Sequence, residues 1–283
     1  MKQVFTLFML LFSVCAFAQD SVNINSNTNP VGITAVEDVT EDSAFTLDTG
    51  VGLYSRSFWR GIKFGSGASV QGYADFSMVN EKGNGAFGIG AFSTANFNGS
   101  FADYGNTMNL YLYYTQDVGD NSSITVLLDD YYFYNEDNLG QAFDYDDETT
   151  LHYIEARVEA QVGNWDAIVG YSIYQGQVDS GDVDDDGNPI LVEQDTAPYI
   201  ELGYAVNENT RLFAGGVTGA SALNFQTNSG VTNIGVTQSR EIRNIPFEFT
   251  FACNPSYNKT SDYSMGRPAT ASAFSFVAAI WLE

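Results

Sequence analysis

One acidic stretch of the chain has the residue types and the spacing of a calcium-binding loop. The run from Asp182 to Glu193, DVDDDGNPILVE, fits the pattern D-x-[DN]-x-[DN]-G-x5-E along its whole length. Calcium takes six to eight hard oxygen ligands, and carboxylates around a glycine turn supply them. The pattern predicts a weak Ca²⁺ site in the loop 182–193, with a chance match in an Asp-rich stretch as the alternative. The predicted ligands are Asp182, Asp184, Asp186, Asn188 and Glu193.

A second set of charged residues lies within stretches that otherwise alternate with apolar residues. If those stretches are strands in a membrane, a charge that faced lipid at mid-depth would cost about 2–4 kcal/mol, so inward placement is favoured. Such charges either brace a small barrel as ion pairs or line a narrow hydrated path, and we expect a combination of the two. The candidate lining residues are Arg56, Asp75, Glu155, Arg157, Glu159, Glu201, Arg211 and Glu248, with Arg60 beside them.

Enzymatic chemistry has little support in the residue types. The single histidine, His152, falls on the apolar face of its stretch, and a hydrolytic triad needs a nucleophile and an orienting group within its reach. The chain has no His or Cys cluster for zinc and no phosphate-binding loop. We therefore predict that the protein is not an enzyme and requires no cofactor.

Composition and charge exclude several classes of protein. The chain carries a net charge of −24, whereas nucleic-acid binding needs a basic face. Aromatic residues make up 14% of the chain, which is unlike a disordered acidic protein. Thirteen of the 35 acidic residues fall in the stretches 135–148 and 177–195, which predict either an electronegative vestibule for cations or a solvated surface.

The chain divides into three parts. Residues 1–18 have a charged start, an apolar run and a small-x-small end, which predicts a secretory signal peptide. Residues 19–44 are polar and have no periodicity, so we expect a flexible lead. Residues 45–283 are predicted to form the folded part.

Hydrophobicity in residues 45–283 alternates with period two in long runs. A transmembrane strand needs about 9–11 residues, and short and long connections alternate along the chain, as in outer-membrane barrels. The sequence predicts an all-β fold, a single antiparallel transmembrane β-barrel of about twelve strands, with a soluble secreted β protein as an alternative. The predicted strands are 47–60, 68–79, 85–97, 106–117, 122–134, 149–162, 164–176, 196–206, 209–221, 231–240, 246–254 and 272–283.

The two ends of the folded part resemble one family of barrels. The stretch LYSRSFWRGI at 53–62, followed by VQGYADFS at 70–77, is similar to the first hairpin of the TorF-type porins. The stretches GAFGIGAFS at 85–93, NLYLYY at 109–114, NIGV at 233–236 and FACNP at 251–255 are also similar to that family. The resemblance implies an outer-membrane β-barrel with a porin role. The acidic loop at 177–195 has no assigned counterpart, and the chain ends WLE and not on an aromatic residue.

Together these patterns predict a passive small-solute channel in the outer membrane of a Gram-negative bacterium, reached after signal-peptide export. Lining charges and acidic loops would give it a preference for cations. The expected partners are outer-membrane lipid and small solutes or cations, with no nucleic acid. The alternative is a non-conducting structural or surface-binding protein that uses its acidic loops to bind calcium. The sequence does not indicate an oligomeric state.

Overall fold

The protein folds as one closed antiparallel barrel. The computed structural model describes residues 45–64, 67–97, 106–134, 139–183, 189–243, 245–256 and 274–282. Twelve strands hydrogen-bond in a ring, and the only helical element in those ranges is one 3-10 turn, η1 (Leu139–Gln141). The predicted all-β fold and the number of strands are therefore confirmed.

The ring follows the order of the chain, so most neighbouring strands are joined directly. Its strands are β1 (Phe45–Tyr54), β4 (Ser69–Val79), β5 (Gly85–Asn96), β6 (Asn106–Gly119), β7 (Ser122–Tyr134), β8 (His152–Val162), β9 (Trp165–Gln175), β12 (Tyr199–Asn207), β13 (Thr210–Val217), β14 (Gly230–Ile242), β15 (Ile245–Cys253) and β16 (Phe274–Leu282). Pairing of β1 with both β4 and β16 closes the ring.

The large apolar side chains of the wall face outward. On β6, Leu110, Leu112 and Tyr114 are 39–45% exposed, whereas the intervening Tyr111 and Tyr113 are at most 5% exposed. The same alternation runs around the ring, which reverses the arrangement of a water-soluble core. Monomeric soluble proteins rarely expose contiguous apolar surface of this kind, and a membrane barrel requires it.

Inward-facing glycines make room for aromatic rings inside the barrel. A Cβ atom at Gly88 would lie 2.3 Å from the ring of Tyr113, and one at Gly90 would lie 2.3 Å from the ring of Tyr111. Both tyrosines belong to the neighbouring strand β6 and are directly paired with those glycines. This packing explains why a chain rich in aromatic residues is also rich in glycine.

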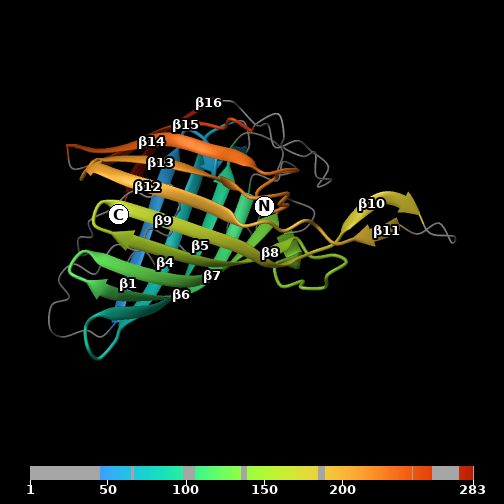
Figure 1. Ribbon diagram of the computed structural model, residues 1–283, viewed down its shortest axis with the longest axis horizontal. Helices are drawn as coiled ribbons and strands as arrows, with labels where there is room; N and C mark the ends of the chain where they lie inside the picture. Colours follow the sequence, from blue (N-terminus) through green and yellow to red (C-terminus); the bar gives the residue numbers. More distant parts are fainter. Residues whose placement is uncertain are drawn as a thin grey trace.

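The connections differ between the two ends of the barrel (Figure 1). Tight turns gather at one end, for example between Val162 and Trp165. At the other end a separate hairpin, β10 (Val178–Val183) with β11 (Pro189–Val192), extends beyond the wall. Among the described residues no helix is long and apolar enough to cross a membrane.

The first predicted strand is too long. The range 47–60 was expected to be continuous, but β1 ends at Tyr54, and the chain then forms a small hairpin of β2 (Ser57–Trp59) and β3 (Ile62–Phe64). The ten residues of β1 already reach the 9–11 that a membrane span needs, and the chain then turns into the interior, whereas β6 keeps all 14 of its residues in the wall.

The seam between the first and last strands is the shortest part of the ring. Only four residue pairs, from Val51 with Leu282 to Tyr54 with Ala279, join β1 to β16 in the described ladder. Just beyond it, the Ser55 amide donates to the Ala278 carbonyl at 2.8 Å, and the Ala278 amide donates to Ser55 Oγ at 2.9 Å. The chain enters the small hairpin directly from this seam.

Candidate functional site

The hairpin 57–64, which we call the plug hairpin, lies inside the barrel. Its Ile62 is fully buried and packs in one apolar cluster with Tyr131, Tyr153 and Leu223. Tyr131 and Tyr153 come from the wall strands β7 and β8. Leu223 belongs to residues 221–226, which we call the cap turn and which a bridge between Ser221 and Gln226 closes. The interior is thus filled here by two loop segments as well as by the wall.

The turn of the plug hairpin fits closely against the wall. Gly61 has φ of +83°, and a Cβ atom there would lie 1.6 Å from the carbonyl oxygen of Thr232 on β14. The Gly61 carbonyl in turn accepts a hydrogen bond of 3.1 Å from Asn254 Nδ2 at the end of β15. Glycine is required here because both the backbone conformation and the contact exclude a side chain.

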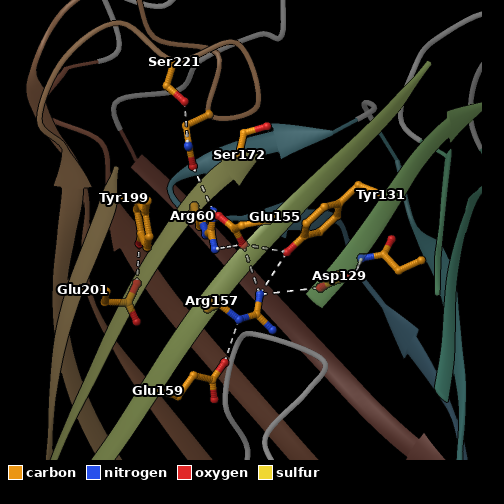
Figure 2. Close-up of polar contacts among 12 residues, drawn as sticks. Arg60, Asp129, Tyr131, Glu155, Arg157, Glu159, Ser172, Tyr199, Glu201 and Ser221 are labelled. Atoms are coloured by element: carbon orange, nitrogen blue, oxygen red, sulfur yellow. Dashed lines mark hydrogen bonds and ion pairs between the residues drawn. The ribbon is translucent and has the colours of Figure 1, made fainter. Parts of the chain in front are cut away.

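Arg60, next to Gly61, forms the central ion pair of the interior (Figure 2). Its Nη1 and Nη2 donate to the two carboxylate oxygens of Glu155 at 2.7 and 2.8 Å, and Nη1 also donates to Asn224 Oδ1 at 3.1 Å. Its guanidinium group lies 4.2 Å from the ring centre of Tyr199 and 4.4 Å from that of Trp59. Arg60 is 4% exposed and Glu155 is 0% exposed.

This environment keeps Arg60 charged. Burial is the largest single effect and lowers the pKa of the guanidinium group, but the charge and hydrogen bonds of Glu155 together with Tyr131 outweigh burial and raise the pKa above its usual value. Deprotonation of Arg60 is therefore no route to release of the plug hairpin.

Glu155 is shared with a second arginine, Arg157, from the same strand. Arg157 Nη1 lies 3.5 Å from Glu155 and 3.6 Å from Asp129, and it donates to the Tyr131 hydroxyl at 2.9 Å. Its Nε lies 2.8 Å from Glu159. We call Arg60, Asp129, Tyr131, Glu155, Arg157 and Glu159 the lumen charge cluster; Figure 2 shows it against the wall strands.

A second ion cluster lies nearby. Arg211 on β13 pairs with Asp166 on β9, and its Nη2 lies 3.0 Å from Glu201 Oε1 on β12. The other Glu201 oxygen accepts hydrogen bonds from the Tyr199 hydroxyl at 2.5 Å and from Asn233 Nδ2 at 3.0 Å. Because Tyr199 also lies against Arg60, the two clusters adjoin.

Water reaches one half of this interior and not the other. Side-chain exposure is 16% at Glu159, 23% at Asp166 and 12% at Arg211, but only 1% at Arg157 and Glu155. Glu159 is the cluster member nearest the tight turn that follows Val162, so the accessible half faces the end with the short turns. The fully buried part of the interior lies at the level of the plug hairpin.

The remaining predicted lining residues are placed as follows. Asp75 lies inside the barrel and accepts a hydrogen bond of 2.8 Å from the Tyr113 hydroxyl. Glu248 is 7% exposed and has the Thr250 hydroxyl 3.5 Å away. Arg56 was expected on the inward face of a strand, but it lies in the link between β1 and β2, because the wall strand ends at Tyr54.

The calcium hypothesis concerns a region that is only partly described. Asp184, Asp186 and Asn188 lie outside the described residues, whereas Asp182 and Glu193 lie at opposite ends of the β10–β11 hairpin. Val178 pairs with Val192 and Val183 with Pro189, which puts about five residues, roughly 16 Å, between the two carboxylates along the hairpin. No group of three or more acidic, His or Cys residues suited to a metal occurs among the described residues. Calcium binding stays a prediction.

His152 lies on the outer face, where the alternation places it. Its Nδ1 is 2.8 Å from Asp130, and its ring stacks between Tyr132 and Tyr145 at 4.6 and 4.2 Å. The other oxygen of Asp130 accepts a hydrogen bond of 2.5 Å from the Tyr145 hydroxyl. The Nε2 atom is buried and has no hydrogen-bond partner among the described residues. A histidine and carboxylate pair alone does not make a hydrolase, so the absence of enzymatic activity stays a prediction.

Sequence reasoning missed several residues of this site. It did not place Asp129, Tyr131, Tyr199, Asn224 or the ion partner Asp166 inside the barrel. The length of the predicted first strand gives no signal for the plug hairpin, since β6 is equally long and stays in the wall. Nothing in the cap turn sequence, SALNFQ, indicates that it folds inward.

Comparisons with known proteins give only distant structural likenesses. No protein-family model and no curated protein matches the chain. Among solved structures, the outer membrane phospholipase of Salmonella typhi, a dimer with bound calcium, is similar with a TM-score of 0.42 at 10% identity, over 87% of this chain and 94% of that chain. A Pseudomonas aeruginosa FadL homologue has a TM-score of 0.35 at 10% identity, over 84% and 74%. Membership of the TorF-type family stays a prediction.

Proposed function

We propose that the protein is a small-solute channel of the Gram-negative outer membrane, with a preference for cations, whose resting state is closed by the plug hairpin. On this proposal residues 1–18 are the export signal, and the wall spans the bilayer. The outward band of exposed apolar side chains, such as Leu112 at 45%, Val126 at 54% and Phe276 at 58%, supports contact with lipid.

One observation carries the channel proposal. The interior is accessible to water up to Glu159, Asp166 and Arg211, and above them it is filled by wall side chains together with the plug hairpin and the cap turn, which are not part of the wall. A barrel built only as a solid support would be filled by its own wall side chains, as small eight-stranded barrels are. Here wall side chains such as Tyr111 and Leu127 fill part of the interior, and a hairpin that joins β1 to β4 but is not a member of the ring fills the space beside Glu155.

The charges along this interior support a preference for cations. Three arginines, Arg60, Arg157 and Arg211, are in ion pairs with five carboxylates. Displacement of the plug hairpin removes Arg60 and leaves an excess of negative charge facing the path. A low-dielectric wall concentrates the field of such charges and raises the local concentration of cations.

Membrane insertion is tested first. Purified from detergent extracts, the protein is expected to run faster on gels when unheated than when boiled, because a closed barrel stays compact in detergent. It should be extracted from membranes only with detergent. Full solubility in plain buffer without any mobility shift would contradict a transmembrane barrel.

The channel is tested by replacing the plug. Tyr54 and Ser69 are directly paired across β1 and β4, so a Gly-Ser linker of about four residues can replace residues 55–68 and join the two strands, with loss of the Ser55 side-chain contact to Ala278. In planar bilayers the wild type is expected to stay mostly closed. The replacement variant is expected to conduct continuously and to pass potassium in preference to chloride.

A matched control replaces a connection at the other end. Exchange of Glu81 and Lys82 in the exposed 80–84 turn for Gly-Ser should leave the wild-type behaviour unchanged. A replacement variant that keeps its heat-modifiable mobility but does not conduct would favour the alternative, a non-conducting structural or surface-binding barrel. The burial of Glu155 and Arg157 in the resting state is the observation that supports this non-conducting alternative.

A further inference from the structure

Arg60 occupies a pocket made by parts of the chain that do not belong to the plug hairpin. Glu155 comes from β8, Tyr199 from β12 and Asn224 from the cap turn. These three residues converge on one guanidinium group, as Figure 2 shows for Arg60, Glu155 and Tyr199. Glu155, Tyr199 and Asn224 are therefore contributed by the barrel and its cap turn, whereas the plug hairpin supplies the occupant, Arg60, and one aromatic neighbour, Trp59.

The chemistry of the pocket is selective for one kind of cation. The two oxygens of Glu155 each accept one hydrogen bond from a different terminal nitrogen of Arg60, at 2.7 and 2.8 Å. Only a planar group with two parallel N–H donors makes this contact, which a rounded ammonium cannot reproduce. The face of Tyr199, at 4.2 Å, favours a flat and weakly hydrated cation, and Asn224 Oδ1 accepts a third hydrogen bond at 3.1 Å.

The pocket has support that does not depend on Arg60. The Tyr131 hydroxyl lies 3.3 Å from Glu155 Oε2, and Arg157 lies 3.5 Å from the same oxygen. Gly170 on β9 leaves the space that the carboxylate fills, since a Cβ atom there would lie 2.3 Å from Glu155 Oε1. These contacts hold the carboxylate in place when the arginine leaves.

We propose that this pocket is a binding site for solutes that carry a guanidinium group, and that Arg60 is an internal substitute for such a solute. An external guanidinium compound competes with Arg60 for Glu155 and so favours release of the plug hairpin. The opening step rests on the proposed channel function, whereas occupation of the pocket does not.

The pocket is tested in detergent, without any measurement of conductance. In an Arg60→Ala variant the pocket lacks its occupant, and methylguanidinium is the probe, with methylammonium as the matched control cation. We expect calorimetric titration to show binding of methylguanidinium at least tenfold tighter than that of methylammonium. Wild-type protein should bind methylguanidinium at least tenfold more weakly than the variant, because Arg60 competes. Equal binding of the two cations would overturn the proposal.

A second variant without Arg60 controls for a folding defect in the Arg60→Ala protein. The variant in which a Gly-Ser linker replaces residues 55–68 also removes Arg60 and keeps Glu155, Tyr199 and Asn224. Addition of Glu155→Gln to either background is expected to abolish the preference for methylguanidinium, and a preference that survives this change would overturn the proposal. If methylguanidinium binds as expected but never opens the wild-type protein in bilayers, the pocket stands and the opening step fails, while a replacement variant that does not conduct refutes the channel proposal separately.

Discussion

Replacement of Arg60 by alanine is expected to shift the protein from mostly closed to mostly open in planar bilayers. In the closed state this change leaves Glu155 fully buried without its bidentate partner. Removal of one partner of a buried ion pair costs about 3–5 kcal/mol, which corresponds to a change of roughly 100-fold or more in the ratio of closed to open states. Departure of the plug hairpin lets water reach the carboxylate, so the cost falls on the closed state only.

The measurement is single-channel open probability under identical salt and voltage. Arg240→Ala is the matched control, because Arg240 is an exposed arginine of β14. It should leave the open probability at the wild-type value. An Arg60→Ala protein that is correctly inserted yet as closed as the wild type would show that this ion pair does not hold the plug hairpin in place.

Gly61→Ala is expected to release the plug hairpin as completely as its removal does. The added Cβ atom would lie 1.6 Å from the backbone oxygen of Thr232, which belongs to the wall and has no flexible end to move aside. Its φ of +83° adds strain of about 1 kcal/mol for any residue with a side chain. The variant hairpin therefore cannot occupy its site, and burial of Ile62 is lost with it.

Limited proteolysis checks this result, with cleavage expected within the hairpin in the variant only and continuous conductance in parallel. Gly83→Ala is the control variant that distinguishes a steric clash of the added Cβ atom from the strain of a positive φ angle. Gly83 also has positive φ, at +68°, but nothing lies within 4 Å of its Cβ position. Cleavage and conductance in the Gly83 variant should match the wild type. Protection of residues 57–64 in the Gly61 variant would mean that the hairpin seats in another way.

The wall of the barrel could be predicted from the sequence, and the content of its interior could not. Alternation with period two is a local property, and it places Glu155, Arg157 and Glu201 on one face of their strands and His152 on the other. The positions of Arg56 and Arg60 were harder to predict, because the sequence from the end of β1 into the plug hairpin looks like a continuation of the strand. The partners of Arg60 lie 95 and 164 positions away in the chain, and a local sequence pattern cannot predict contacts between residues so far apart.

The motif with the most complete match gave the least information about the fold. The pattern from Asp182 to Glu193 describes a loop between two helices, and here part of it folds into a β hairpin. Spacing in the sequence fixes which residues follow one another, but the conformation of the backbone decides which oxygens meet. The lumen charge cluster shows the converse, since its members share no motif and are brought together by strand pairing.

The position of the plug hairpin at the seam has a consequence for how the protein assembles. The hairpin is among the first folded parts to leave the ribosome, but Thr232 and Asn254, which flank Gly61, lie near the other end of the chain, and the Asn254 contact joins residues 193 positions apart. Contacts of such long range form late because the intervening chain must first be ordered. The hairpin therefore has to remain unseated until β14 and β15 have joined the wall. Filling of the interior is then a late event of assembly, and an intermediate caught before it would have an open interior.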